Sequence, residues 1–175
     1  MYKKICASIF AVSTIAATLG HAAANEIRDT GKNKLVERGK YVVSTSGCND
    51  CHTPGYAQAG GAAPIANWLT GSPVGFSGPW GVTYPANLRI KFQQMSEAEW
   101  MAEARSERRP PMPWFMLRDM TDTDLRSIYW FVRSLGSSGE AAPAYVAPGG
   151  VVATPYIEFV PKMPERVAQQ ARSDH

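Results

Sequence analysis

Residues 44–54 read STSGCNDCHTP and place two cysteines and a histidine within five positions, at Cys48, Cys51 and His52. The whole chain of 175 residues contains only three cysteines and three histidines. The gathering of such scarce residues in one short stretch predicts a site where two thiols and an imidazole act together.

The first 24 residues have the parts of an export signal. Lys3 and Lys4 form a positive start, an apolar run follows, and the small residues Ala22 and Ala24 close it. We expect residues 1–24 to be removed as a signal peptide and the protein to be periplasmic. The apolar run is shorter than the roughly 20 residues that a helix needs to cross a bilayer, so no membrane span is expected after cleavage.

Removal of the signal leaves Cys48, Cys51, His52 and His175 as the cysteines and histidines of the mature chain. A four-ligand zinc site would need all of them, including the last residue of the chain. A thioredoxin-like redox pair would need a strand leading into the site and a βαβ pattern, and neither is visible. The mature chain has a net charge of about +1, which does not favour nucleic acid as a partner.

The spacing Cys-x-x-Cys-His is the pattern of a c-type haem attachment site. Two thiols must reach the two vinyl groups at one edge of a porphyrin, and the adjacent histidine must then lie beneath the iron. One turn of helix brings all three to the same place. We therefore expect one covalently bound haem c on Cys48 and Cys51, with His52 as an iron ligand.

A second iron ligand is expected from a methionine, because the only other mature histidine, His175, ends the chain. A thioether commonly serves a c-type haem and raises its potential. Met112 stands in PPMPW, residues 110–114, where three prolines fix φ and remove backbone donors. Such a loop can hold a weakly binding thioether in one position. We predict Met112 as the ligand, with Met116 as the alternative; the other methionines are expected to pack.

Three helices are predicted around this site. Residues 33–47 carry an apolar stripe that includes Gly39, which permits close approach of another helix. Ser96 and Glu99 form a capping box that opens a second helix, and Thr121 caps a third that ends at Gly136.

Two segments show no period of either kind. Residues 53–95 are predicted to be a long loop that wraps a large ligand. Residues 137–175 are rich in Pro, Gly and Ala but keep several aromatics, so we expect an extended strap lying on the domain, with the last ten residues disordered.

These features resemble the class I cytochrome c family over residues 34–136: RGKYVVSTSGCNDCHT in the first helix and motif, PPMPW in the loop, and TDTDLRSIYWFVRSL in the closing helix. The resemblance implies an all-α fold of about three main helices with long haem-wrapping loops. It divides the chain into a signal peptide (1–24), a cytochrome c domain (25–136) and a C-terminal extension (137–175). In that family the first and last helices cross at a glycine that faces an aromatic, which matches Gly39 with Tyr129 or Trp130.

The stretch GVTYPANLR is similar to cytochromes that accompany bacterial dehydrogenases, but their usual Thr-Pro-Asp after ANL is replaced here by Arg89-Ile90-Lys91. The resemblance also implies that a proline carbonyl after the motif accepts the second imidazole proton of His52. Pro64 is expected in this role, with Pro54 as the other candidate.

Several side chains are expected near the haem. Ordinary packing is the first interpretation of Trp80, Tyr84 and Arg89, with contact to the haem propionates as the alternative. An apolar wall is predicted from Phe76, Trp100, Trp114, Phe115 and Leu117. A basic patch that could dock a partner, or form only a solvated helix end, is predicted from Arg105, Arg108 and Arg109.

The expected function is that of a periplasmic mono-haem cytochrome c that carries single electrons and is not an enzyme. Its expected partners are redox proteins, such as a dehydrogenase and a terminal oxidase or another cytochrome. One alternative is a haem enzyme or gas-binding sensor with an open or displaceable sixth position. Another is a permanent subunit of a dehydrogenase complex, with the strap as its contact.

Overall fold

The computed structural model describes residues 30–164. The predicted signal peptide, residues 1–24, and the predicted disordered end both lie outside this range, as does His175. A first helix covers residues 30–45. The elements that follow are α2 (Cys48–His52), the 3-10 helix η1 (Ile65–Asn67), β1 (Gly75–Gly78), β2 (Gly81–Thr83), α3 (Leu88–Gln94), α4 (Glu97–Ala104), α5 (Trp114–Arg118), α6 (Asp122–Ser134) and β3 (Tyr156–Glu158).

The first helix packs across α6, and the contact depends on Gly39. A Cβ at this position would collide with the backbone carbonyl of Ser127 and with the side chain of Phe131. Tyr129 and Trp130 were predicted to face Gly39, and this prediction is wrong. Residues 127 and 131 are four apart on one face of α6, whereas the Tyr129 hydroxyl donates to the carbonyl of Met95 at 3.1 Å on another face.

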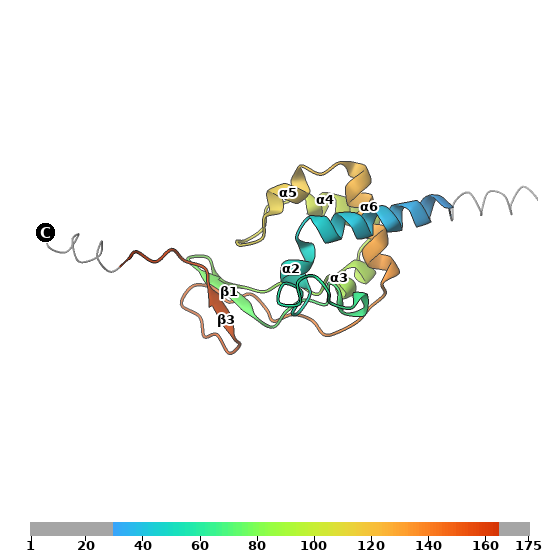
Figure 1. The fold of residues 1–175 in the computed structure, drawn as a ribbon. Coiled ribbons are helices and arrows are strands. Elements are labelled where there is room, and N and C mark those ends of the chain that lie inside the picture. The colour runs from blue at the N-terminus through green and yellow to red at the C-terminus, as the bar shows by residue number, and fades with distance from the viewer. Residues whose placement is uncertain (1–29, 165–175) are drawn as a thin grey trace, which may run out of the picture.

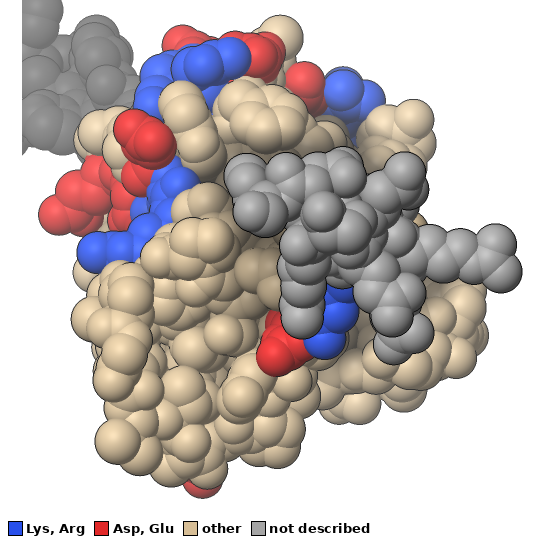
Figure 2. Space-filling view, turned by 90° about the vertical axis from the view of Figure 1, so that its left-hand side faces the viewer, with Lys and Arg blue, Asp and Glu red and all other residues tan. Residues whose placement is uncertain are grey.

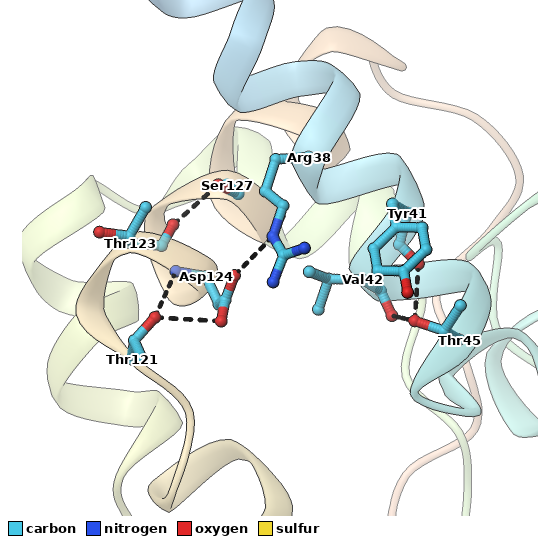
Figure 3. Close-up of polar contacts among 8 residues, drawn as sticks. All are labelled: Arg38, Tyr41, Val42, Thr45, Thr121, Thr123, Asp124 and Ser127. Atoms are coloured by element: carbon cyan, nitrogen blue, oxygen red, sulfur yellow. Dashed lines mark hydrogen bonds and ion pairs between the residues drawn. The ribbon is translucent and has the colours of Figure 1, made fainter.

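An ion pair joins the same two helices. The Nε of Arg38 lies 2.8 Å from the Oδ1 of Asp124, and the Oδ2 of Asp124 accepts a hydrogen bond from the Thr121 hydroxyl at 3.0 Å (Figure 3). Thr121 in turn accepts from the backbone N–H of Asp124 and so caps α6, as predicted.

The predicted ends of the other helices are confirmed. Ser96 and Glu99 form the complete capping box at the start of α4. Gly136, just past α6, has a left-handed φ of 70°, which suits glycine at the end of a helix.

The segment predicted as one long loop contains regular structure. Asn87 caps α3 by accepting from the N–H of Ile90 at 3.1 Å. β1 pairs antiparallel with β2 and parallel with β3, so the strand order is β2-β1-β3. Strands of three or four residues and a seven-residue helix are too short to produce a clear hydrophobic period, which explains why the sequence pattern did not reveal them.

The strap is confirmed as an extended segment on the domain. It leaves α6, passes α3, and reaches β1 on the opposite side of the molecule, where it forms β3 (Figure 1). The fold is therefore mostly helical, with a small sheet that the C-terminal extension completes. Within residues 30–164, no helix is both long enough and apolar enough to cross a membrane.

The core lies between α3, α4 and α6. Phe92, Trp100, Leu125 and Val132 are all buried there, and the Trp100 indole donates to the carbonyl of Leu125 at 2.7 Å. The aromatic rings of Phe92 and Trp100 pack with their centres 4.6 Å apart. The candidate site lies directly against Phe92 and Trp100 of this core.

Candidate haem site

The Cys-x-x-Cys-His motif forms the short helix α2, which begins where the first helix ends. Gly47 adopts a left-handed φ of 71° between the two helices, a conformation that favours glycine. The single turn of α2 then carries Cys48, Cys51 and His52. The prediction that one helical turn brings these residues together is confirmed.

Buried hydrogen bonds hold α2 against the loop that follows it. The Thr53 hydroxyl donates to the side-chain oxygen of Asn49 at 2.7 Å and accepts from the N–H of Leu69 at 2.8 Å. The N–H of Gly71 donates to the carbonyl of His52 at 2.8 Å. Asn49, one of the two unspecified positions of the motif, therefore has a structural role.

The imidazole of His52 is oriented by a backbone carbonyl. Its Nδ1 lies 2.8 Å from the carbonyl oxygen of Ala86. The predicted acceptors Pro64 and Pro54 are wrong: the carbonyl comes from the residue after Pro85, in a turn much farther along the chain. This hydrogen bond makes Nδ1 the protonated nitrogen and leaves Nε2 as the one able to bind a metal.

Burial sets the ionisation of the three motif side chains. It lowers the pKa of His52, with Lys91 lowering it further and the Ala86 hydrogen bond opposing both. The imidazole is therefore neutral at pH 7. Burial raises the pKa of Cys48 to about 11. Burial also raises the pKa of Cys51, and the negative charge of Asp50 raises it further. No disulfide joins Cys48 to Cys51.

All four residues predicted to bind the haem line one cavity of about 330 Å³. Cys48, Cys51, His52 and Met112 line it, and most of the remaining wall is apolar. Met116 and Met120 line it as well, so three methionines border the cavity. The cavity therefore brings together two thiols, one oriented imidazole and several thioethers, with aromatic side chains in its wall. This is the set of groups that a covalently held haem requires.

The protein-family model for cytochrome c matches residues 36–136. The chain belongs to the cytochrome c family. The matched segment runs from the first helix through α6 and so contains all four residues predicted to bind the haem. No curated protein matches the chain, and no solved structure matches it either. Family membership makes the chain a haem-based electron carrier with covalently bound haem c.

The site residues fit that group. In this cytochrome, Cys48 and Cys51 would hold the haem through thioether bonds, and His52 would bind the iron through Nε2. Within residues 30–164, no group of three or more His, Cys, Asp or Glu side chains could hold a metal ion in another way.

One wall of the cavity carries charge. Lys91 and Arg108 both line the cavity and both pair with the carboxylate of Glu103, the Arg108 Nη1 at 2.7 Å. Burial raises the pKa of Glu103, but the hydrogen bonds from Lys91 and Arg108 outweigh that effect and bring it below its usual value. The cluster therefore has two cations and one anion at neutral pH, a net charge of +1. No sequence signal pointed to Lys91 or Glu103.

The three candidates for propionate contact have different positions. Tyr84 lines the cavity, and its hydroxyl lies 2.6 Å from that of Thr154 in the strap. Arg89 donates instead to the carbonyls of Ala66, Leu135 and Gly136, which fastens the end of α6. The Trp80 indole donates to the carbonyl of Phe76 at 3.4 Å. Packing is thus the role of Arg89 and Trp80.

The predicted apolar wall is partly right. Phe76, Trp100 and Leu117 line the cavity, but Trp114 and Phe115 do not. The Trp114 ring lies beneath the guanidinium of Arg118, and Phe115 is about half exposed. Both residues are on α5, whose cavity-facing positions are Met116 and Leu117.

The three predicted docking arginines are each engaged within the protein. Arg105 pairs with Asp122, Arg108 pairs with Glu103, and the guanidinium of Arg109 lies over the ring of Tyr145. Charged side chains of both signs gather at the top and upper left of the molecule in Figure 2, whereas the visible lower part is mostly uncharged apart from a red and blue group beside the grey residues and a red residue at the lower edge. Arg108 and Arg109 also line the cavity, although Arg109 is exposed at the surface as well.

Proposed function

We propose that the chain is a periplasmic mono-haem cytochrome c that carries single electrons between redox proteins, with His52 and Met112 as the two iron ligands. The observation that supports this most is the convergence of Cys48, Cys51, His52 and Met112 on one apolar-lined cavity. A single Cys-x-x-Cys-His motif in the sequence supports one haem per chain. The signal-like residues 1–24 support export.

The bound haem supplies a one-electron iron couple, and the protein residues set the conditions under which that couple works. The Ala86 carbonyl keeps His52 in the tautomer whose Nε2 binds iron. Phe92, Trp100 and Leu117 exclude water from the cavity. With both His52 and Met112 bound to the iron, no position would remain on it for a small substrate, so transfer of electrons through the haem edge would be the remaining activity.

The assignment of the second ligand rests on the loop around Met112. Prolines at 110, 111 and 113 restrict φ on both sides of this residue. Met116 and Met120 belong to α5 and to the turn after it, and both also border the cavity. These two residues are the rivals that an experiment must separate from Met112.

An absorption spectrum of the purified ferric protein tests the ligand set. A sulfur–iron bond gives a weak charge-transfer band in the far red, which water-ligated haem lacks. We expect the band in the wild type, in Met116→Ala and in Met120→Ala, and its loss in Met112→Ala alone. A band that survives Met112→Ala would move the ligand to another methionine. A wild type without the band would favour the open-site alternatives, a haem enzyme or a gas-binding sensor.

Two further measurements test the rest of the proposal. Release of the protein by osmotic shock, with a mature N-terminus at Asn25, would support the periplasmic location. A haem-to-protein ratio of one would support the mono-haem state. Stable co-purification with a dehydrogenase would instead favour the permanent-subunit alternative over the free carrier.

A further inference from the structure

The C-terminal strap is fastened to the β1–β2 hairpin at two places. β3 pairs with β1, and nearer to α6 the residues Val146 and Val82 form an isolated bridge. The N–H of Val82 donates to the Val146 carbonyl at 2.8 Å, and the N–H of Val146 donates back at 3.0 Å. Gly81 permits this approach, because a Cβ there would collide with the Val146 carbonyl oxygen.

The bridge places Tyr145 of the strap at the haem cavity. Its ring is part of the cavity lining, and its hydroxyl donates to the carbonyl of Trp80 at 2.8 Å. The ring is therefore held from two sides, by the Val146 bridge in the backbone and by the Trp80 carbonyl at its tip. Because Tyr145 is held at both places, it can restrict the movement of a residue that packs against its ring.

What packs against Tyr145 is the loop that carries the methionine. The guanidinium carbon of Arg109 lies 4.0 Å from the centre of the Tyr145 ring, within the range of a cation–π interaction. Arg109 is the residue before the proline run that contains Met112.

A second contact reaches the same loop from β2. The Thr83 hydroxyl donates to the carbonyl of Pro110 at 2.8 Å. Thr83 follows Val82 and Tyr145 precedes Val146, so the two residues flank one bridge and hold two successive loop residues. Because Pro110, Pro111 and Pro113 restrict the backbone, constraint at 109 and 110 is passed on to Met112.

We propose that Tyr145 and Thr83 are positioning residues for the sixth iron ligand: together they clamp residues 109–110 so that the Met112 thioether stays in the cavity. This gives the C-terminal extension a role at the haem. The inference rests on the proposed function, since it takes Met112 as the ligand. An iron–thioether bond is weak, so the freedom of the loop decides how readily an external ligand displaces it.

Imidazole binding to the ferric holoprotein tests the clamp. Its apparent dissociation constant depends on the fraction of molecules in which the methionine is off the iron. We expect Tyr145→Ala and Thr83→Val each to bind imidazole roughly 3- to 10-fold more tightly than the wild type, corresponding to the loss of about one such interaction. Thr83→Ser, which keeps the hydroxyl, should bind as the wild type does.

The control is Tyr156→Ala, which removes another strap tyrosine that is half exposed on β3 and does not line the cavity. Its imidazole affinity should equal that of the wild type even if its stability falls. Arg109→Gln provides a second route, because it removes the cation–π contact from the loop side while leaving the strap residue Tyr145 in place, and it should act like Tyr145→Ala.

The outcomes separate this inference from the proposed function. A wild type that shows the far-red band, with Tyr145→Ala, Thr83→Val and Arg109→Gln all within twofold of its imidazole affinity, would overturn the clamp and leave Met112 as ligand. If Tyr145→Ala does not fold, an unchanged affinity in Thr83→Val and Arg109→Gln overturns it equally. A wild type without the band overturns the ligand assignment and the clamp with it.

Discussion

The Nδ1 of His52 lies 2.8 Å from the carbonyl oxygen of Ala86, so the orientation of the proposed iron ligand depends on a turn 34 residues away. Asn87 holds this turn in place. Its side-chain oxygen caps α3, and its amide donates to the carbonyls of Ser138 and Glu140 in the strap at 2.8 and 2.9 Å. One buried side chain thus connects the histidine turn, a helix and the C-terminal extension.

We predict that Asn87→Ala lowers the free energy of unfolding by about 2–3 kcal/mol, because a helix cap and two partly buried hydrogen bonds are lost. Urea denaturation of the holoprotein measures this loss. Asn33→Ala on the exposed surface of the first helix is the control and should change stability by about 0.5 kcal/mol or less. Equal losses in the two variants would contradict the role given to Asn87.

Gly39→Ala should destabilise the protein by about 2 kcal/mol or more, because the added methyl group meets the backbone of α6 at Ser127. Gly31→Ala in the same helix has open space around it and should be neutral or stabilising by up to about 1 kcal/mol. Thermal unfolding of the pair separates close packing from helix propensity. A tolerated alanine at position 39 would be inconsistent with the observed crossing.

The Arg38–Asp124 pair predicts a dependence of stability on pH. The hydrogen bond from Arg38 holds the pKa of Asp124 below its ordinary value of 3.8 in the folded protein. A depressed folded-state pKa stabilises the fold at pH values above the unfolded-state pKa, and this contribution is lost as pH falls through the folded-state pKa. Asp124→Asn should therefore be less stable than the wild type at pH 7, with a difference that shrinks below about pH 4.

The control for this pH profile is Glu37→Gln, which changes an exposed carboxylate on the same helix as Arg38. It should follow the wild type at all pH values. A difference between Asp124→Asn and the wild type that stays constant down to pH 2 would show that the ion pair is not its source.

Glu103→Gln should raise the reduction potential by tens of millivolts. Glu103 is the anion of the cluster on the cavity wall, and its removal leaves Lys91 and Arg108 uncompensated. Added positive potential favours the reduced iron, because the reduced iron carries less positive charge. A change of one charge about 10 Å from the iron, at an effective dielectric constant of 20, corresponds to a shift of roughly 70 mV in the reduction potential. Glu107→Gln, exposed and outside the cavity lining, should shift the potential by no more than about 10 mV. A potential that falls in Glu103→Gln would refute the sign of this effect.

The parts of the fold that could be predicted from sequence have local causes. The haem motif depends on the spacing of Cys48, Cys51 and His52, and the helix ends depend on caps such as Ser96 and Thr121, which act within one turn. Met112 was singled out by the prolines beside it, and the structure places it at the cavity as expected. Its bond to iron stays a prediction.

The parts that could not be predicted depend on contacts between distant residues. The acceptor for His52 is a backbone carbonyl, and every residue has one, so no side-chain signal distinguishes Ala86. Which aromatic residue faces Gly39 depends on how α6 is rotated about its own axis. That rotation decides whether Phe131 or Tyr129 lies at the helix crossing, and no local signal in the sequence indicates it. The clamp by Tyr145 depends on the pairing of the strap with β2, and both segments are too short to show a strand pattern.

Covalent attachment of one haem to Cys48 and Cys51 would increase the mass of the denatured, purified protein, and mass spectrometry measures that increase. Production with residues 1–24 present, in a cell that attaches haem to exported proteins, should give a chain heavier than its amino acids by the mass of one haem. Changing both cysteines to serine should abolish the increase. A wild-type chain that weighs only as much as its amino acids and has no visible colour would contradict the account.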